Sequence, residues 1–250
     1  VASLAYAINQ INTENLISSI SSLHVWPFLI MFTCFIILFW KIEGKARDPI
    51  IRINVFNREI FLTSLISIIS GLNEAGLVFI PAFAIVALSF NNSMASLMLL
   101  PVVVSMGVGA PIIGHILDKV GSKILMISGG LSLSIGLFIF GLYGIQLNYF
   151  ILSSIFIGLG LSSILGAPVR YIMINEFPVS ERATGQGLIN INTSFGQLIG
   201  GAIVGSIIAS MGNGVYAYEF AYIFLAFSAV LLTILSLGLK GRMAELKMMK

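Results

Sequence analysis

"GHILDKVGSK", residues Gly114 to Lys123, carries the only charged side chains between Glu74 and Arg170. A long apolar run precedes it and another follows it. A short charged turn between two such runs is typical of two membrane-spanning helices that are joined at one face of a bilayer. The turn therefore indicates a chain whose main solvent is lipid.

The composition favours the bilayer over water. Of 250 residues, 58% are hydrophobic and only 9% are charged, whereas a soluble globular domain has about 25% charged residues. A soluble protein of this length would need many more Lys, Arg, Asp and Glu residues on its surface. The formal net charge of +3 is too small to suggest a nucleic-acid partner, and the single cysteine, Cys34, allows no internal disulfide.

Seven apolar runs approach or exceed the roughly 20 residues that a helix needs to cross the hydrocarbon. They are continuous and not alternating, which predicts helices and not the strands of a membrane barrel. The seven runs are Leu23 to Trp40, Ile60 to Leu88, Ala95 to Leu117, Ile124 to Tyr143, Tyr149 to Met173, Thr184 to Met211 and Phe220 to Leu239. The predicted fold class is an all-α integral membrane protein, a helical bundle.

Basic residues occupy only alternate connections between these runs. All 13 Lys and Arg residues follow the first, third, fifth or last run or lie near its end, and residues 89–94, 144–148 and 212–219 contain none. Basic residues concentrate in cytoplasmic loops. We therefore expect a multi-pass protein of the plasma membrane, the cell inner membrane, with a cytoplasmic C-terminus.

The charged segment 41–59, "KIEGKARDPIIRINVFNRE", divides the chain, and its Asp48-Pro49 pair stops a helix. Val1 begins a stretch, "VASLAYAI", without the features of a signal peptide, so we expect a fragment of a longer protein. The predicted organisation is the end of a helix and an external loop at 1–22, a membrane helix at 23–40, a cytoplasmic linker at 41–59, a six-helix unit at 60–239 and a cytoplasmic tail at 240–250.

Six spans after a cytoplasmic linker, with "GHILDKVGSK" between the second and third, resemble the C-terminal half of a Major Facilitator Superfamily transporter. The residues that match the GxxxDKxGxK loop signature of that family, motif A, are Gly114, Asp118, Lys119, Gly121 and Lys123. The segments "ARDPIIRINVF" and "NEFPVSERATGQGLININTSFGQLIGGAIVG" are similar to the fourteen-span drug:proton antiporter branch, which inserts two helices between its halves. The resemblance implies that residues 1–8 end the first inserted helix, that 23–40 form the second, and that an N-terminal half is the missing partner.

The motif A turn also has physical features of its own. Gly114 can let a helix end approach a neighbour, and Gly121 can turn the chain at little steric cost. Asp118 can lie against a helix N-terminus or a basic partner. The turn is either an ordinary tight connection that only fixes orientation or a gate clamp, and the rest of the pattern favours the clamp. His115 is either a group that titrates near neutral pH or a polar residue at the membrane interface.

Glu74 lies near the middle of its span, where a carboxylate has to be neutralised, paired or hydrated. It belongs to a stripe of small and polar residues on one helical face, which predicts a water-filled cavity beside that face. The stripe consists of Thr63, Ser64, Ser67, Ser70, Gly71 and Glu74. A desolvated carboxyl can bind and release protons near neutral pH, as a proton-coupled exchanger requires, so Glu74 is the candidate for proton coupling. The alternative is a structural acid, and Asn73, off the stripe, is a weaker candidate for the substrate path.

A second polar face follows the run from Thr184 to Met211. It consists of Gln186, Asn190, Thr193, Gln197 and Gly200. Its amides and hydroxyl can line a substrate path or hold helices together, and both interpretations stay open. We expect helix packing at the glycines with GxxxG spacing, which are Gly196, Gly200, Gly201 and Gly205. Arg170, just beyond the helix-breaking Pro168, is either a snorkelling anchor or a contact for anionic groups on that path.

These features predict part of a secondary active transporter that works by alternating access. The specific version is a proton-coupled multidrug exporter whose partners are a small amphipathic substrate, protons and the lipid bilayer. A solute importer that works by symport and a non-transporting receptor or scaffold stay open as alternatives. An enzyme is disfavoured, because two histidines and one cysteine form neither a metal site nor a catalytic triad. We expect no cofactor and no metal, and the lack of a GxxxxGK[ST] loop argues against ATP as the energy source.

Overall fold

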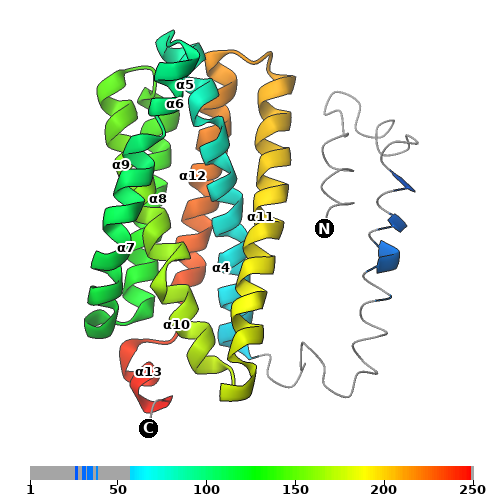
Figure 1. The fold of residues 1–250 in the computed structure, drawn as a ribbon, viewed down its shortest axis with the longest axis vertical. Helices are drawn as coiled ribbons and strands as arrows, with labels where there is room; N and C mark the ends of the chain where they lie inside the picture. The colour runs from blue at the N-terminus through cyan, green and yellow to red at the C-terminus, as the bar shows by residue number, and fades with distance from the viewer. Residues whose placement is uncertain (1–25, 28–29, 32, 36–37, 39–56, 249–250) are drawn as a thin grey trace.

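The computed structural model describes residues 26–27, 30–31, 33–35, 38 and 57–248. This set does not include residues 1–22, most of the span expected at 23–40 or nearly all of the linker expected at 41–59. Within residues 57–248 the chain forms one upright bundle of helices (Figure 1). The elements, in order, are α4 (Arg58–Ala75), η3 (Gly76–Phe79), α5 (Ile80–Leu88), α6 (Asn92–Leu97), α7 (Leu100–Val120), α8 (Ser122–Tyr143), α9 (Leu147–Leu165), α10 (Ala167–Glu176), η4 (Val179–Glu181), α11 (Arg182–Ser210), α12 (Val215–Leu237) and α13 (Arg242–Met248).

Six helical stretches in the described chain are long and apolar enough to cross a membrane. They are Arg58–Leu88, Asn92–Val120, Ser122–Tyr143, Leu147–Glu176, Val179–Ser210 and Val215–Leu237. These stretches match the last six predicted runs with shifts of a few residues at their ends. The all-α membrane bundle predicted from the apolar runs is therefore confirmed.

The first of these six stretches is not the continuous helix that the apolar run predicted. It breaks at η3, because Pro81 opens α5 without an N–H group and its ring would clash with the carbonyl of Leu77, four residues earlier. The hydroxyl of Tyr222 on α12 donates a hydrogen bond of 3.1 Å to the backbone oxygen of Gly76 at this break. A second break separates α9 from α10 at Gly166, next to Pro168, as the sequence predicted for that proline.

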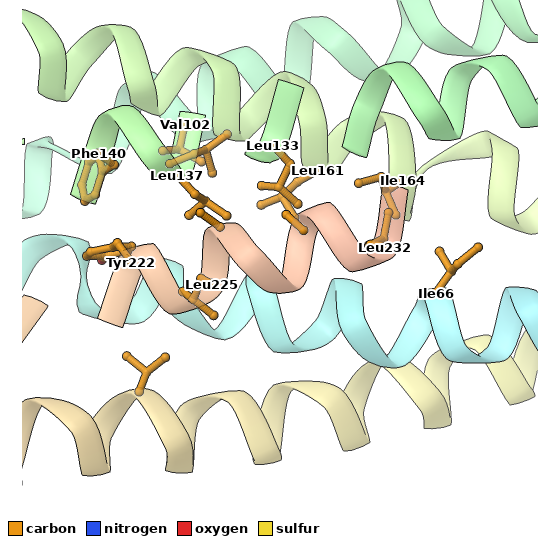
Figure 2. Packing of buried hydrophobic residues seen from close by; sticks show 14 of the residues in the cluster. Ile66, Val102, Leu133, Leu137, Phe140, Leu161, Ile164, Tyr222, Leu225 and Leu232 are labelled. Carbon is orange, nitrogen blue, oxygen red and sulfur yellow. The ribbon is translucent and has the colours of Figure 1, made fainter. Parts of the chain in front are cut away.

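The core of the bundle lies between α8, α9 and α12, with α7 packed on α9. Figure 2 shows Leu133 of α8 and Leu161 of α9 pointing toward α12, whose Leu232 belongs to the same cluster; all three side chains are fully buried. Aromatic rings extend this core toward α5, where Phe140 lies edge-on to Tyr222 at 4.5 Å between ring centroids. These four helices pack as one group, and α4 contacts this group mainly through α12.

Helix α11 packs mainly on α4, and glycines bring the two backbones into contact. A Cβ atom at Gly196 would overlap the backbone oxygen of Ile68, and one at Gly200 would lie 2.5 Å from the backbone oxygen of Leu72. From the other side, a Cβ atom at Gly71 would overlap the backbone oxygen of Thr193. Small residues commonly permit such close approach between membrane helices.

The other two glycines for which packing was expected differ from Gly196 and Gly200. Among the described residues, no atom lies within 4 Å of a Cβ atom built at Gly201. A Cβ atom at Gly205 would meet only the ring of Phe79, at 3.7 Å, which is an ordinary van der Waals distance. The close contact therefore ends at Gly200, and the expectation of tight packing at Gly201 is wrong for this part of the chain.

We expect Gly196→Ala to lower the melting temperature of the purified full-length protein. The added methyl group would clash with backbone atoms of α4, which cannot move aside as a flexible side chain could. Overpacking of this kind costs about 1–3 kcal/mol. Gly201→Ala on the same helix is the matched control, since its methyl group enters open space. Equal melting temperatures for the two variants in thermal unfolding would contradict the close contact between α4 and α11.

Candidate functional site

An open concavity of about 420 Å³ lies where α4, η3 and α11 meet. Glu74 lies in the last turn of α4, immediately before the helix break, and Gln197 faces the same space from α11. The other lining residues are mostly apolar: Ala75, Leu77, Val78, Phe79 and Gly201. One carboxyl and one amide within apolar walls is a suitable arrangement for an amphipathic ligand or for water.

Glu74 is half-buried, and its side chain forms no hydrogen bond or ion pair with any residue that the structure describes. A carboxyl in this position has to find water, a proton or a partner from another part of the protein. The structure therefore brings together Glu74, Gln197 and Gly201 from the sequence-predicted residues.

The prediction that the whole stripe on α4 faces water is wrong. Thr63, Ser67 and Ser70 are at most 1% exposed. The hydroxyls of both serines donate to backbone oxygens one turn earlier, Ser67 to Thr63 at 2.8 Å and Ser70 to Ile66. A helical serine can satisfy its hydroxyl in this way without water, so small polar residues at these positions are compatible with tight packing.

Asn73 also lies away from the concavity. It is 2% exposed, and its amide donates to the backbone oxygen of Ile69 at 2.8 Å and to the hydroxyl of Ser228 on α12 at 2.9 Å. A buried amide with these two partners holds α4 against α12 and does not reach a substrate from this position. The structure thus separates Asn73 from the other candidates for the substrate path.

The polar face predicted on α11 is divided between four surroundings. Gln186 pairs with Arg170 of α10: its amide donates to the Arg170 backbone oxygen at 3.2 Å, and the guanidinium lies 3.4 Å from its Oε1. Asn190 is exposed, and the Thr193 backbone lies against Gly71. Only Gln197 reaches the concavity, so Arg170 and Gln186 form a separate polar pair near the end of the bundle where α10 leads into α11.

The motif A turn joins α7 to α8 at Gly121, whose φ of +83° belongs to the region that favours glycine. Asp118 is exposed, and no described residue pairs with its side chain; its backbone oxygen accepts a hydrogen bond from Arg242. Lys119 is exposed too, whereas Lys123 is half-buried. At Gly114 an added Cβ atom would meet no described atom within 4 Å, so the close helix approach expected there is not present in this part of the chain.

One end of the bundle, the lower end in Figure 1, holds the motif A turn, the start of α4, the α10–α11 connection and the end of α12. We call it the basic end. The sequence analysis missed a charged network there. The backbone N–H of Lys240 donates to Glu59, its Nζ pairs with Glu176, and Asn57 donates to the other oxygen of Glu176. Because Glu59 and Glu176 are adjacent to basic connections, a search for acids at those ends could have suggested the pairing.

Comparison with known proteins identifies related sequences over most of this region. A sequence model of the Major Facilitator Superfamily matches residues 63–245. An uncharacterized MFS-type transporter YfiU of Bacillus subtilis (strain 168) is 24% identical over 201 residues, which are 78% of this chain and 39% of that protein. The Multidrug resistance protein Stp of Mycobacterium tuberculosis (strain ATCC 25618 / H37Rv) is 20% identical over 186 residues, which are 69% of this chain and 33% of that protein. The chain thus spans less than half the length of these curated relatives.

The network at the basic end predicts energetic coupling between Glu176 and Lys240. Glu176→Gln and Lys240→Met should each lower the melting temperature, because each leaves one charged partner without its ion pair. Lys240 is 39% exposed, so solvent screening keeps each effect to a few degrees. The double variant should lose less than the sum of the two single losses; strict additivity in thermal unfolding would show that the pair contributes nothing.

Proposed function

Because this chain belongs to the Major Facilitator Superfamily, we propose that it forms part of a secondary active transporter that exports small amphipathic compounds in exchange for protons. The chain is a multi-pass membrane protein of a transporter family, not of an enzyme family. The observation that carries the specific proposal is Glu74, an acid without a described partner, at an open apolar concavity within a membrane span.

The concavity supplies two kinds of contact for a substrate. Leu77, Val78 and Phe79 offer apolar surface, and Glu74 and Gln197 offer a carboxyl and an amide at its edge. An amphipathic molecule with a cationic or hydrogen-bond-donating group would use both kinds together. The name of the mycobacterial relative, a multidrug resistance protein, supports a substrate of this class for the present chain.

Proton exchange follows from the alternatives open to the Glu74 carboxyl. Either a proton or a cationic substrate can neutralise a carboxylate that has no other partner, so the two compete for this site. Substrate that enters from the cytoplasm would therefore displace the proton from Glu74, and a proton taken up from the outside would displace the substrate. The carboxyl ends each cycle as it began, with one proton moved inward for one substrate moved outward.

Alternating access requires a second set of helices on the other side of the concavity. The relatives exceed this chain in length, since the aligned regions are 39% and 33% of theirs. We propose that an N-terminal half supplies those helices, that residues 23–40 are an inserted span of the fourteen-span drug:proton antiporter branch, and that the motif A turn gates the path. The basic end, with the C-terminus, would face the cytoplasm of a cell whose plasma membrane holds the protein.

Glu74→Gln tests the proton role with little change in side-chain size. In the full-length protein it should abolish substrate-induced proton release from proteoliposomes, because an amide does not titrate, while the amount of folded protein stays near that of the wild type. Glu219→Gln, at the start of α12 and outside the concavity, should release protons like the wild type.

Proton release by Glu74→Gln at the wild-type stoichiometry would show that Glu74 is a structural acid and that another part of the protein carries the proton. Unchanged substrate transport in that variant would show that transport does not depend on a proton at Glu74, and an absence of transport in the wild type would favour the non-transporting alternative.

A further inference from the structure

The short helix α13 packs against the motif A turn and completes the N-terminus of α8. Ser122 is the first residue of α8, and Gly121 before it has no side chain that could cap the helix. The carboxylate of Glu245 accepts hydrogen bonds from the Ser122 backbone N–H, at 3.2 Å, and from its hydroxyl. A negative charge at this point satisfies an open backbone donor and interacts favourably with the helix dipole.

On the other side of the turn, Arg242 completes the C-terminus of α7. Its Nη2 donates to the backbone oxygen of Asp118, one of the carbonyls in the last turn of α7, and its Nη1 lies 3.3 Å from the hydroxyl of Tyr171 on α10. A positive charge is favourable at a helix C-terminus for the same electrostatic reason. The short helix α13 thus supplies a negatively charged side chain to the start of α8 and a positively charged one to the end of α7.

Gly121 and α13 also fit each other sterically. A Cβ atom at Gly121 would lie 2.8 Å from Glu245 Oε2 and 3.0 Å from Arg242 Cδ. Glu245 is 4% exposed, and Arg242 lies 3.8 Å from its Oε2, so the carboxylate is held between the turn and the guanidinium. The glycine of the turn therefore serves two purposes: it adopts the positive φ and it leaves room for α13.

We propose that Glu245 and Arg242 are positioning residues of the gate: α13 fixes the motif A turn so that α7 and α8 move as one unit. This inference rests on the proposed function for the role of the turn as a gate. Without α13 the donors of α8 and the carbonyls of α7 lose their charged partners, and the angle between the two helices is free to vary. The rate of the conformational step should then fall, whereas the concavity at Glu74, about 24 Å along α4 from the basic end, keeps its contacts.

The proposal can be tested on the full-length protein in lipid nanodiscs by hydrogen exchange of the backbone amides of residues 117–126. Glu245→Ala should speed exchange in this turn about tenfold, and Glu245→Gln, which keeps an acceptor oxygen, should have a smaller effect. Met243→Ala is the control on α13, since Met243 is 80% exposed. Asp118→Ala is a second exchange control, because Arg242 bonds the backbone oxygen and not the carboxylate of Asp118.

The second arm measures transport in proteoliposomes. Glu245→Ala should lower the turnover number severalfold and leave the substrate concentration at half-maximal rate unchanged, with Met243→Ala equal to the wild type. Unchanged exchange of the turn in Glu245→Ala would overturn the proposal, and so would faster exchange with normal turnover. If the wild type transports no amphipathic substrate, the proposed function fails, and the exchange arm still decides whether α13 holds the turn.

Discussion

The close contact between α4 and α11 determines where the concavity beside these two helices lies. Apolar burial does not hold helices together within lipid, so their association depends on packing and on hydrogen bonds. Gly71, Gly196 and Gly200 provide that packing by letting backbone touch backbone. Beyond Gly200 the contact ends, and the concavity that contains Glu74 begins at this point. The glycine contacts therefore close one part of the α4–α11 interface, which we call the α4–α11 seam, and leave the other part open.

The charged residues fall into two groups with different surroundings. At the basic end, acids and bases complete one another: Glu176 pairs with Lys240, and Glu245 lies between Ser122 and Arg242. Within the membrane span, Glu74 has no such partner in the described part of the chain. The buried acids Glu59, Glu176 and Glu245 thus bond to neighbouring segments. Asp118 is exposed at the basic end, and Glu74 is the acid that lines the open concavity. This contrast is the physical argument for a role of Glu74 in transport.

The number and type of the helices could be predicted from the sequence because the thickness of the bilayer fixes the length of an apolar run. The break at η3 was visible in principle, since Pro81 lies inside the second run, but hydropathy alone does not detect it. Periodicity placed Thr63, Ser67 and Glu74 on one face. It did not say that α11 and other helices cover most of that face, because the covering segments are more than a hundred residues away.

Long-range pairing also limited the prediction of the site. GxxxG spacing marked Gly196, Gly200 and Gly201 alike, and only the register of α11 on α4 separates them. The hydrogen bond between Glu245 and Ser122 joins residues that are 123 positions apart, and no local sequence pattern predicts it. The sequence therefore predicts only a cytoplasmic tail at residues 240–250, although α13 lies within this segment and bonds to the motif A turn.

The central claim is that the concavity beside the α4–α11 seam belongs to a transport path that opens to each side of the membrane in turn. Accessibility of a single cysteine at position 197, in the full-length protein with Cys34 and all other cysteines replaced, tests it most directly. A membrane-impermeant thiol reagent should label this cysteine from both sides, and a transported amphipathic substrate should slow the labelling. Labelling from neither side, or labelling that no substrate affects, would contradict the claim.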